Sequence, residues 1–251
     1  MKYALRPTKP LASLMCAFVL MIGCAIPVPI SRQVIKHFPR YSQRSETVVS
    51  ANYLLYEPAG YNDSLDVERR WPAILFLHGL FESGEDIDII TRRGLPRQLE
   101  LGFKIPFIVV SPQNPSGSWD LVALTALLDE VLERYPIDPD RLYVTGVSLG
   151  GRATWDLAAA YPNRIAAIAP ISAWGNVDTA HRVKDIPIWA QHGEWDPLVW
   201  PSRHKRMIEA VRAAGGRPKW TVIQDAGHDI WDKVYSDPKL YEWFLQHRLK
   251  P

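Results

Sequence analysis

The turn at residues 143–151 limits what this chain can fold into more than any other stretch. It reads Tyr-Val-Thr-Gly-Val-Ser-Leu-Gly-Gly, so Ser148 lies between two glycines, each two residues away. The apolar residues 142–144 predict a buried strand before the turn, and Gly151 and Arg152 begin a predicted helix after it. Flanking glycines permit a strand-to-helix turn too tight for larger side chains. We therefore predict that Ser148 projects its hydroxyl as a nucleophile, although the motif alone would also fit a glycine- and serine-rich loop without chemistry.

Two residues further along the chain could activate that hydroxyl. A neutral serine is a poor nucleophile, so a base must take its proton, and His228 follows the last predicted strand. The imidazole then needs a carboxylate partner, which Asp196 would supply from the end of its own predicted strand. Asp225 and Asp229 flank the histidine and are the alternatives. We favour Asp196, because the partner must approach the ring from across the sheet edge.

Strand and helix patterns alternate along the rest of the chain. Apolar or alternating runs predict strands at residues 47–56, 71–79, 106–112, 141–145, 165–171, 186–191 and 219–224. Amphipathic stretches predict helices at residues 86–101 with a break near 94–96, and at 121–135, 152–161, 202–214 and 230–248. This alternation predicts an α/β fold with a mostly parallel central sheet and helices on both faces.

The amino-terminal residues have a different composition. Basic residues precede an apolar run at 11–23, which is typical of a signal peptide and too short to span a bilayer as a mature helix. The run ends at Cys24 and resembles a bacterial lipobox. We predict a signal peptide at residues 1–23, lipidation of Cys24, a tether at 24–45 and a catalytic domain at 46–251. The protein would be exported and held at the cell envelope by its lipid, with plain secretion as the alternative.

Charge and motif content bear on partners and cofactors. The net charge is only +2 and no long basic run occurs, so nucleic acid is not an expected partner. The sequence has no H-E-x-x-H motif and no pair of cysteines outside the signal segment. We expect no metal and no cofactor.

Four motifs in combination resemble one superfamily. They are residues 77–81 (Leu-His-Gly-Leu-Phe), 146–150 (Gly-Val-Ser-Leu-Gly), 192–196 (His-Gly-Glu-Trp-Asp) and 226–228 (Ala-Gly-His). From about residue 50 onward, the chain resembles the α/β-hydrolases, and among them the small lidless carboxylesterases, dienelactone hydrolases and polyhydroxybutyrate depolymerases. The order Ser148, Asp196, His228 is the order that this fold uses. The resemblance implies a serine esterase that forms an acyl-enzyme.

Such an enzyme needs two hydrogen-bond donors for the oxyanion of its intermediate. The backbone amides of Leu149 and Leu80 are the expected donors. Phe81 stands where related loops usually have a small residue, which leaves Leu80 and Phe81 both open as the second donor.

The expected site is open and rich in tryptophan. Residues 172–185 are too few for a cap domain. Trp119, Trp174 and Trp195 lie in loops on the catalytic side, where indole rings could stack on sugars or aromatic acyl groups. We expect small-molecule or polymer-borne esters with short or aromatic acyl groups. A serine peptidase of the prolyl-oligopeptidase type and a noncatalytic envelope lipoprotein remain the alternatives.

Overall fold

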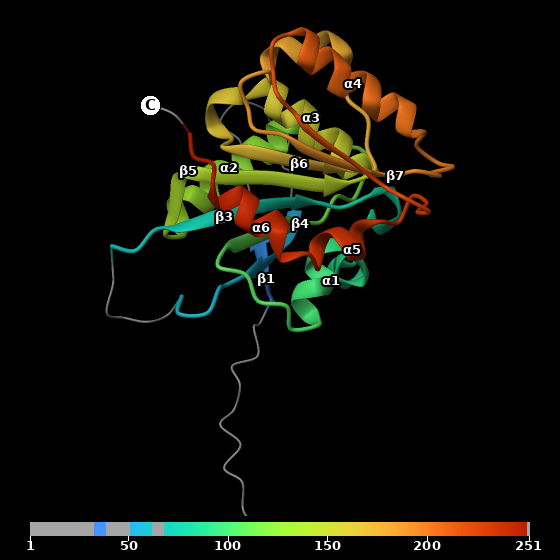
Figure 1. Ribbon diagram of the computed structural model, residues 1–251. Coiled ribbons are helices and arrows are strands. Elements are labelled where there is room, and N and C mark those ends of the chain that lie inside the picture. Colours follow the sequence, from blue (N-terminus) through green and yellow to red (C-terminus); the bar gives the residue numbers. More distant parts are fainter. Residues whose placement is uncertain (1–32, 39–50, 62–67, 250–251) are drawn as a thin grey trace, which may run out of the picture. The chain divides into compact units, whose positions relative to one another are not determined.

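The computed structural model describes residues 33–38, 51–61 and 68–249 (Figure 1). The predicted signal peptide and Cys24 lie outside the described residues. No helix among those that are described is long and apolar enough to cross a membrane.

The described chain is built around one eight-stranded sheet with the order β1-β2-β4-β3-β5-β6-β7-β8. β1 pairs antiparallel with β2, and β2 with β4, whereas all later neighbours are parallel. The strands are β1 (Gln33–Phe38), β2 (Ala51–Tyr56), β3 (Trp71–Leu77), β4 (Ile108–Pro112), β5 (Ile137–Val147), β6 (Ala167–Ile171), β7 (Trp189–Gly193) and β8 (Lys219–Ile223). The predicted α/β class and mostly parallel sheet are confirmed.

Helices cover both faces of the sheet (Figure 1). They are α1 (Gly94–Glu100), α2 (Leu121–Arg134), α3 (Leu149–Ala160), α4 (Pro201–Ala213), α5 (Trp231–Tyr235) and α6 (Pro238–Leu245). Successive strand residues point to opposite faces, so Leu75 of β3 joins a core with α2, α3 and α4, whereas the neighbouring Ile74 joins a core with α1, α5 and α6. Every residue of β3 is buried, as its continuous apolar run predicts.

Three predicted elements need correction. Residues 33–38, assigned to a tether, form strand β1, whose backbone pairs with β2; an edge strand needs little apolar periodicity, because partner hydrogen bonds hold it. The helix predicted at 86–101 does break close to the predicted place, at Arg93, but the part before the break is a 3₁₀-helix, η2 (Ile87–Arg92), and only α1 after it is an α-helix. The helix predicted at 230–248 is divided into α5 and α6, because Pro238 begins a new helix and the Asp237 side chain caps it.

The connection from β6 to β7 is short. It contains one 3₁₀-helix, η4 (Val177–Arg182), and all of its residues are described. No cap domain is present there, so the carboxyl ends of the strands are not covered from this connection.

Candidate active site

Ser148 occupies a strained turn between β5 and α3. Its φ of 53° and ψ of −113° lie in a region that non-glycine residues rarely adopt. Its amide donates to the Ile171 carbonyl at the end of β6 (2.9 Å). A Cβ at Gly150 would clash with the Leu77 carbonyl oxygen, and one at Gly146 would come within 2.5 Å of the Gly150 backbone. The glycines are therefore required by close backbone approach, and they leave Ser148 at the carboxyl edge of the sheet.

His228 bonds directly to Asp196. Nδ1 of the ring lies 2.7 Å from Oδ2 of the carboxylate, and Asp196 is buried. The other carboxylate oxygen accepts the amides of Leu198 and Val199, each at 2.9 Å. Of the three carboxylates considered from sequence, Asp196 is the one that bonds to the ring. Because Nδ1 is engaged there, Nε2 is the ring nitrogen left to act as a base.

The environment keeps Asp196 ionised. Burial by itself raises the pKa of this carboxyl. Hydrogen bonds from His192, His228 and the Val199 amide lower the pKa by more than burial raises it, so the net value lies well below the usual range. An ionised partner stabilises an imidazolium at His228. The hydroxyl of Ser148 forms no hydrogen bond within the described chain, which is common before substrate binds.

The expected oxyanion loop is held by His78. Its Nε2 accepts the Asn114 amide (2.9 Å), so the ring proton is on Nδ1, which donates to the Gly79 carbonyl (2.7 Å). Burial lowers the pKa of His78 to about 4, so the ring is neutral at pH 7. Leu80 begins the short 3₁₀-helix η1 (Leu80–Glu82), and Leu149 begins α3. Both amides lie at strand-to-helix turns that follow neighbouring strands, β3 and β5.

Comparisons with known proteins find esterases and related hydrolases. The Dienelactone hydrolase family matches residues 118–234. A thermostable esterase of known structure is 27% identical with a TM-score of 0.71, and the match covers 85% of this chain and 63% of that one. The chain has the α/β-hydrolase fold.

Two curated relatives of this chain are much longer than the match. The bifunctional acetylxylan esterase/xylanase of Neocallimastix patriciarum is 28% identical over 51% of this chain and 20% of its own length. The poly(3-hydroxyalkanoate) depolymerase C of Paucimonas lemoignei is 33% identical over 54% of this chain and 44% of its own. The chain thus spans less than half of either protein.

A series of buried side-chain contacts connects Trp155 to Asp196 through His204 and His192. The Trp155 indole N–H donates to His204 Nε2 (3.2 Å), and an indole nitrogen can only donate. The His204 proton is therefore on Nδ1, which donates to His192 Nδ1 (2.9 Å). The His192 proton is then on Nε2, which lies 2.9 Å from Asp196 Oδ2 and 2.7 Å from the Val199 carbonyl. Each donor in this relay (Trp155, His204, His192) points toward Asp196.

The relay depends on an uncharged His204. This side chain is fully buried, and burial, followed by repulsion from His192, lowers its pKa well below 6.5. Sequence analysis did not single out His204. The available signal was its spacing: His204 shares one buried stripe of α4 with Met207, Ile208 and Val211.

Two further residues near the site were missed from sequence. Ser172 has a φ of 45°, and its buried hydroxyl donates to the His228 carbonyl (2.8 Å), which ties the end of β6 to the histidine loop. Glu82 is a buried carboxylate 3.4 Å from Arg93 Nη1. Burial raises the pKa of Glu82, and the Arg93 charge opposes that shift. A single polar residue after a strand or in a one-turn helix gives no periodic signal, so sequence analysis singled out neither Ser172 nor Glu82.

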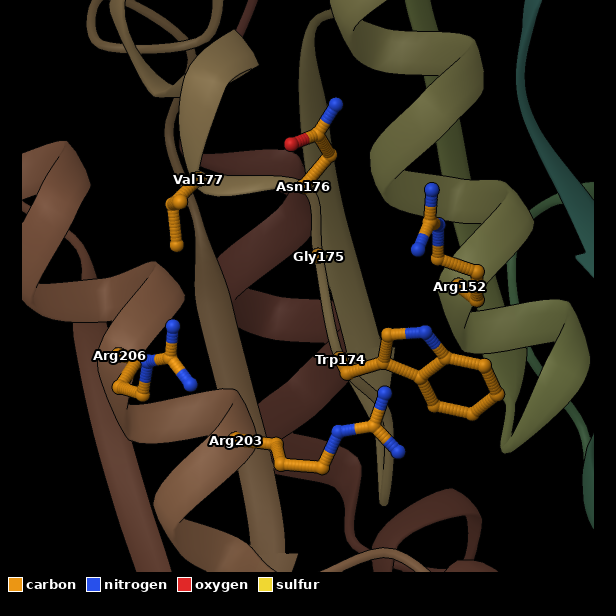
Figure 2. A pocket seen from close by; sticks show the side chains of 7 residues that line it. All are labelled: Arg152, Trp174, Gly175, Asn176, Val177, Arg203 and Arg206. Carbon is orange, nitrogen blue, oxygen red and sulfur yellow. The ribbon is translucent and has the colours of Figure 1, made fainter.

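The three predicted substrate-binding tryptophans differ in their surroundings. Trp119 is half-buried, and its indole donates to the His78 carbonyl (3.3 Å), so it braces the oxyanion loop. Trp195 is 67% exposed, although its amide bonds to the Ala226 carbonyl in the histidine loop. Trp174 lines a pocket with Arg152, Arg203 and Arg206, among others (Figure 2). Only Trp195 and Trp174 therefore present an indole surface that is not already engaged with the catalytic loops.

A metal centre finds no support in the part of the chain that the structure covers. No three His, Cys, Asp or Glu side chains of residues 33–38, 51–61 and 68–249 are grouped to hold an ion.

Proposed function

We propose that this α/β-hydrolase cleaves carboxylic esters through an acyl-enzyme on Ser148. The observation that carries the proposal is the strained turn at Ser148 together with the 2.7 Å bond between Asp196 and His228. The esterase names among its relatives support the reaction class.

The reaction would take place in two displacements. Ser148 Oγ attacks the ester carbonyl carbon while His228 Nε2 takes the hydroxyl proton. The amides of Leu149 and Leu80 stabilise the oxyanion. Collapse expels the alcohol, which takes the proton from His228, and leaves the acyl group on Ser148. A water then loses a proton to His228, attacks the acyl carbon and releases the carboxylic acid, and His228 returns the proton to Ser148. Asp196 orients the ring and stabilises its cationic form throughout.

Small-molecule or polymer-borne esters with short or aromatic acyl groups are the proposed substrates. The short β6–β7 connection leaves the strand ends open, and an exposed indole at Trp195 offers a stacking surface. One relative is named for acetylxylan, and solved structures of the same fold include a ferulic acid esterase (TM-score 0.61, 18% identity) that covers 85% of this chain and 97% of its own.

The test uses residues 25–251 assayed with nitrophenyl acetate, butyrate, octanoate and ferulate, and with a peptide nitroanilide. Turnover of short or ferulate esters that is lost in Ser148→Ala supports the proposal. Retained turnover in a folded Ser148→Ala protein would refute the mechanism. Cleavage of the anilide alone would favour a serine peptidase. No detectable turnover of any of these substrates would favour a noncatalytic role.

We also propose export and lipidation at Cys24, on the basis of the apolar run at 11–23 and the residues around the cysteine. Mass spectrometry of the full-length protein made in a bacterial host tests this. A diacylglycerol-modified peptide that begins at Cys24, absent from Cys24→Ser, is the expected result. An unmodified peptide that begins nearby would indicate plain secretion.

A further inference from the structure

A pocket of about 230 Å³ lies beside α3 and is lined by three arginines. Arg152 comes from α3, and Arg203 and Arg206 come from α4, on the two sides of the segment at residues 174–177 (Figure 2). Trp174, Gly175, Asn176 and Val177 complete the lining. We call this space the arginine pocket.

The arginine pocket carries uncompensated positive charge. Arg152 is paired with Asp156 (2.6 Å). Arg203 and Arg206 have no carboxylate partner within the described chain, and they lie three residues apart on one helix face. Like charges at this spacing repel each other, and a bound anion would relieve that repulsion.

The other lining groups suit an oxyanion. The Trp174 ring lies 5.2 Å from Arg203 Cζ, a cation–π contact that orients the planar guanidinium. Asn176 Oδ1 accepts the Asp178 amide (3.2 Å), which leaves the Asn176 amide nitrogen to donate. Guanidinium forks match carboxylate and phosphate oxygens in geometry and charge.

The segment between the helices is shaped by a glycine. A Cβ at Gly175 would come within 2.5 Å of the Met207 side chain, so glycine lets this segment approach α4 closely without displacing that side chain. The pocket is smaller than the roughly 300–1,000 Å³ of drug-sized ligand sites. It fits one small charged group, with the remainder of the ligand outside.

Two residues of the arginine pocket lie close in sequence to residues that position the catalytic groups. Arg152 is one helical turn beyond Ser148, and its amide donates to the Ser148 carbonyl (2.9 Å). Trp174 is two residues beyond Ser172, whose hydroxyl holds the His228 carbonyl. We propose that the arginine pocket binds a carboxylate or phosphate group carried by the ester substrate. The substrate part of this inference rests on the proposed function, whereas anion binding itself does not.

Calorimetry tests anion binding without any hydrolysis. Inorganic phosphate and glucuronate are titrated separately into the wild type, into Arg203→Gln/Arg206→Gln and into Lys205→Gln/Arg212→Gln. The last variant is the control: it also removes two positive charges from α4, but at exposed positions that do not line the pocket. We expect one or both anions to bind the wild type and the control, and to bind the pocket variant at least about tenfold more weakly.

The outcomes separate the two proposals. Binding of phosphate or of glucuronate identifies which oxyanion the arginine pocket prefers. No binding to the wild type, or equal weakening in both variants, would overturn the pocket even if the protein hydrolyses esters. Binding without any esterase activity would keep the pocket and reject the proposed function.

A second measurement tests whether the arginine pocket binds an acidic group of the ester substrate. The ratio of kcat/KM for acetylated xylo-oligosaccharides with and without glucuronate side groups is compared between the wild type and the two variants. We expect the wild type to favour the acidic substrate and the pocket variant to lose about tenfold of that preference. An unchanged ratio in Arg203→Gln/Arg206→Gln would reject an acidic substrate group in the arginine pocket.

Discussion

At the scale of single residues, the candidate site is organised by hydrogen-bond donors that converge on one carboxylate. Asp196 accepts from two backbone amides and lies within bonding distance of two imidazoles. A buried carboxylate that accepts several hydrogen bonds stays ionised and fixed in position. The relay of Trp155, His204 and His192 therefore helps to orient the His228 ring through Asp196.

His204 gives the sharpest test of the relay. His204→Phe keeps an aromatic ring but leaves the Trp155 N–H unpaired and removes the donor to His192. The His192 ring then loses the donor that fixes it at Nδ1, so its Nε2, which is shared between Asp196 and the Val199 carbonyl, donates less firmly to Asp196. With less competition for its charge, Asp196 favours the imidazolium of His228 more strongly, so the acid limb of the kcat/KM profile moves to higher pH. We also expect kcat to fall about tenfold.

The pH profile distinguishes positioning from a purely structural role. It is measured from pH 5 to 9 with nitrophenyl acetate for the wild type, His204→Phe and His204→Gln. Glutamine can both donate and accept, so His204→Gln should restore part of the rate and return the acid limb toward the wild type. If the two folded variants share the wild-type profile, the relay has no influence on His228.

At the scale of elements, the strand-to-helix turns depend on backbone contacts that leave no room for a Cβ. Gly150 lies in the first turn of α3, where alanine would normally stabilise a helix by up to about 1 kcal/mol. The Leu77 carbonyl oxygen blocks that Cβ, so the packing of α3 against the end of β3 overrides helix propensity.

Gly150→Ala should therefore destabilise the protein by about 3 kcal/mol or more. Gly227→Ala is the matched control, because a Cβ there meets nothing within 4 Å and should change stability by less than about 1 kcal/mol. Urea unfolding followed by tryptophan fluorescence measures both. Equal midpoints for the two variants would contradict the close approach of α3 and β3.

At the scale of the whole molecule, two neutral buried histidines link stability to pH. Burial lowers the pKa of His78 to about 4 and that of His204 well below its ordinary value, whereas both rings have a pKa of about 6.5 in the unfolded chain. Below pH 6.5 the unfolded state binds protons that the folded state does not. Stability is thus highest above pH 6.5 and is lost as the pH falls from about 6.5 to about 4.

Each histidine contributes up to about 1.4 kcal/mol per pH unit in that range. Unfolding free energies of the wild type, His78→Gln and His204→Gln between pH 4 and pH 8 give the measurement. Either variant should flatten the slope below pH 6.5 by up to that amount. A slope that stays the same in both variants would show that neither ring is held neutral.

Much of the fold was predictable from local sequence patterns. The apolar run of β3, the stripe of α2 and the glycines around Ser148 report burial and close approach, which are local demands on residue type. The edge strand β1 and the division between α5 and α6 were not predicted. Pairing with a distant strand leaves almost no sequence signal, and an apolar pattern can continue across a capped break.

The sequence by itself determined the strands from β2 to β8, most of the helices between them and the turn at Ser148, because side-chain period and glycine sterics act over a few residues. The tertiary structure decided which carboxylate bonds to His228, how His204 and His192 stand behind it, and how arginines from α3 and α4 come to line one pocket. These contacts join residues from different elements. Their geometry follows from how the sheet and helices pack, and no short stretch of the chain encodes it.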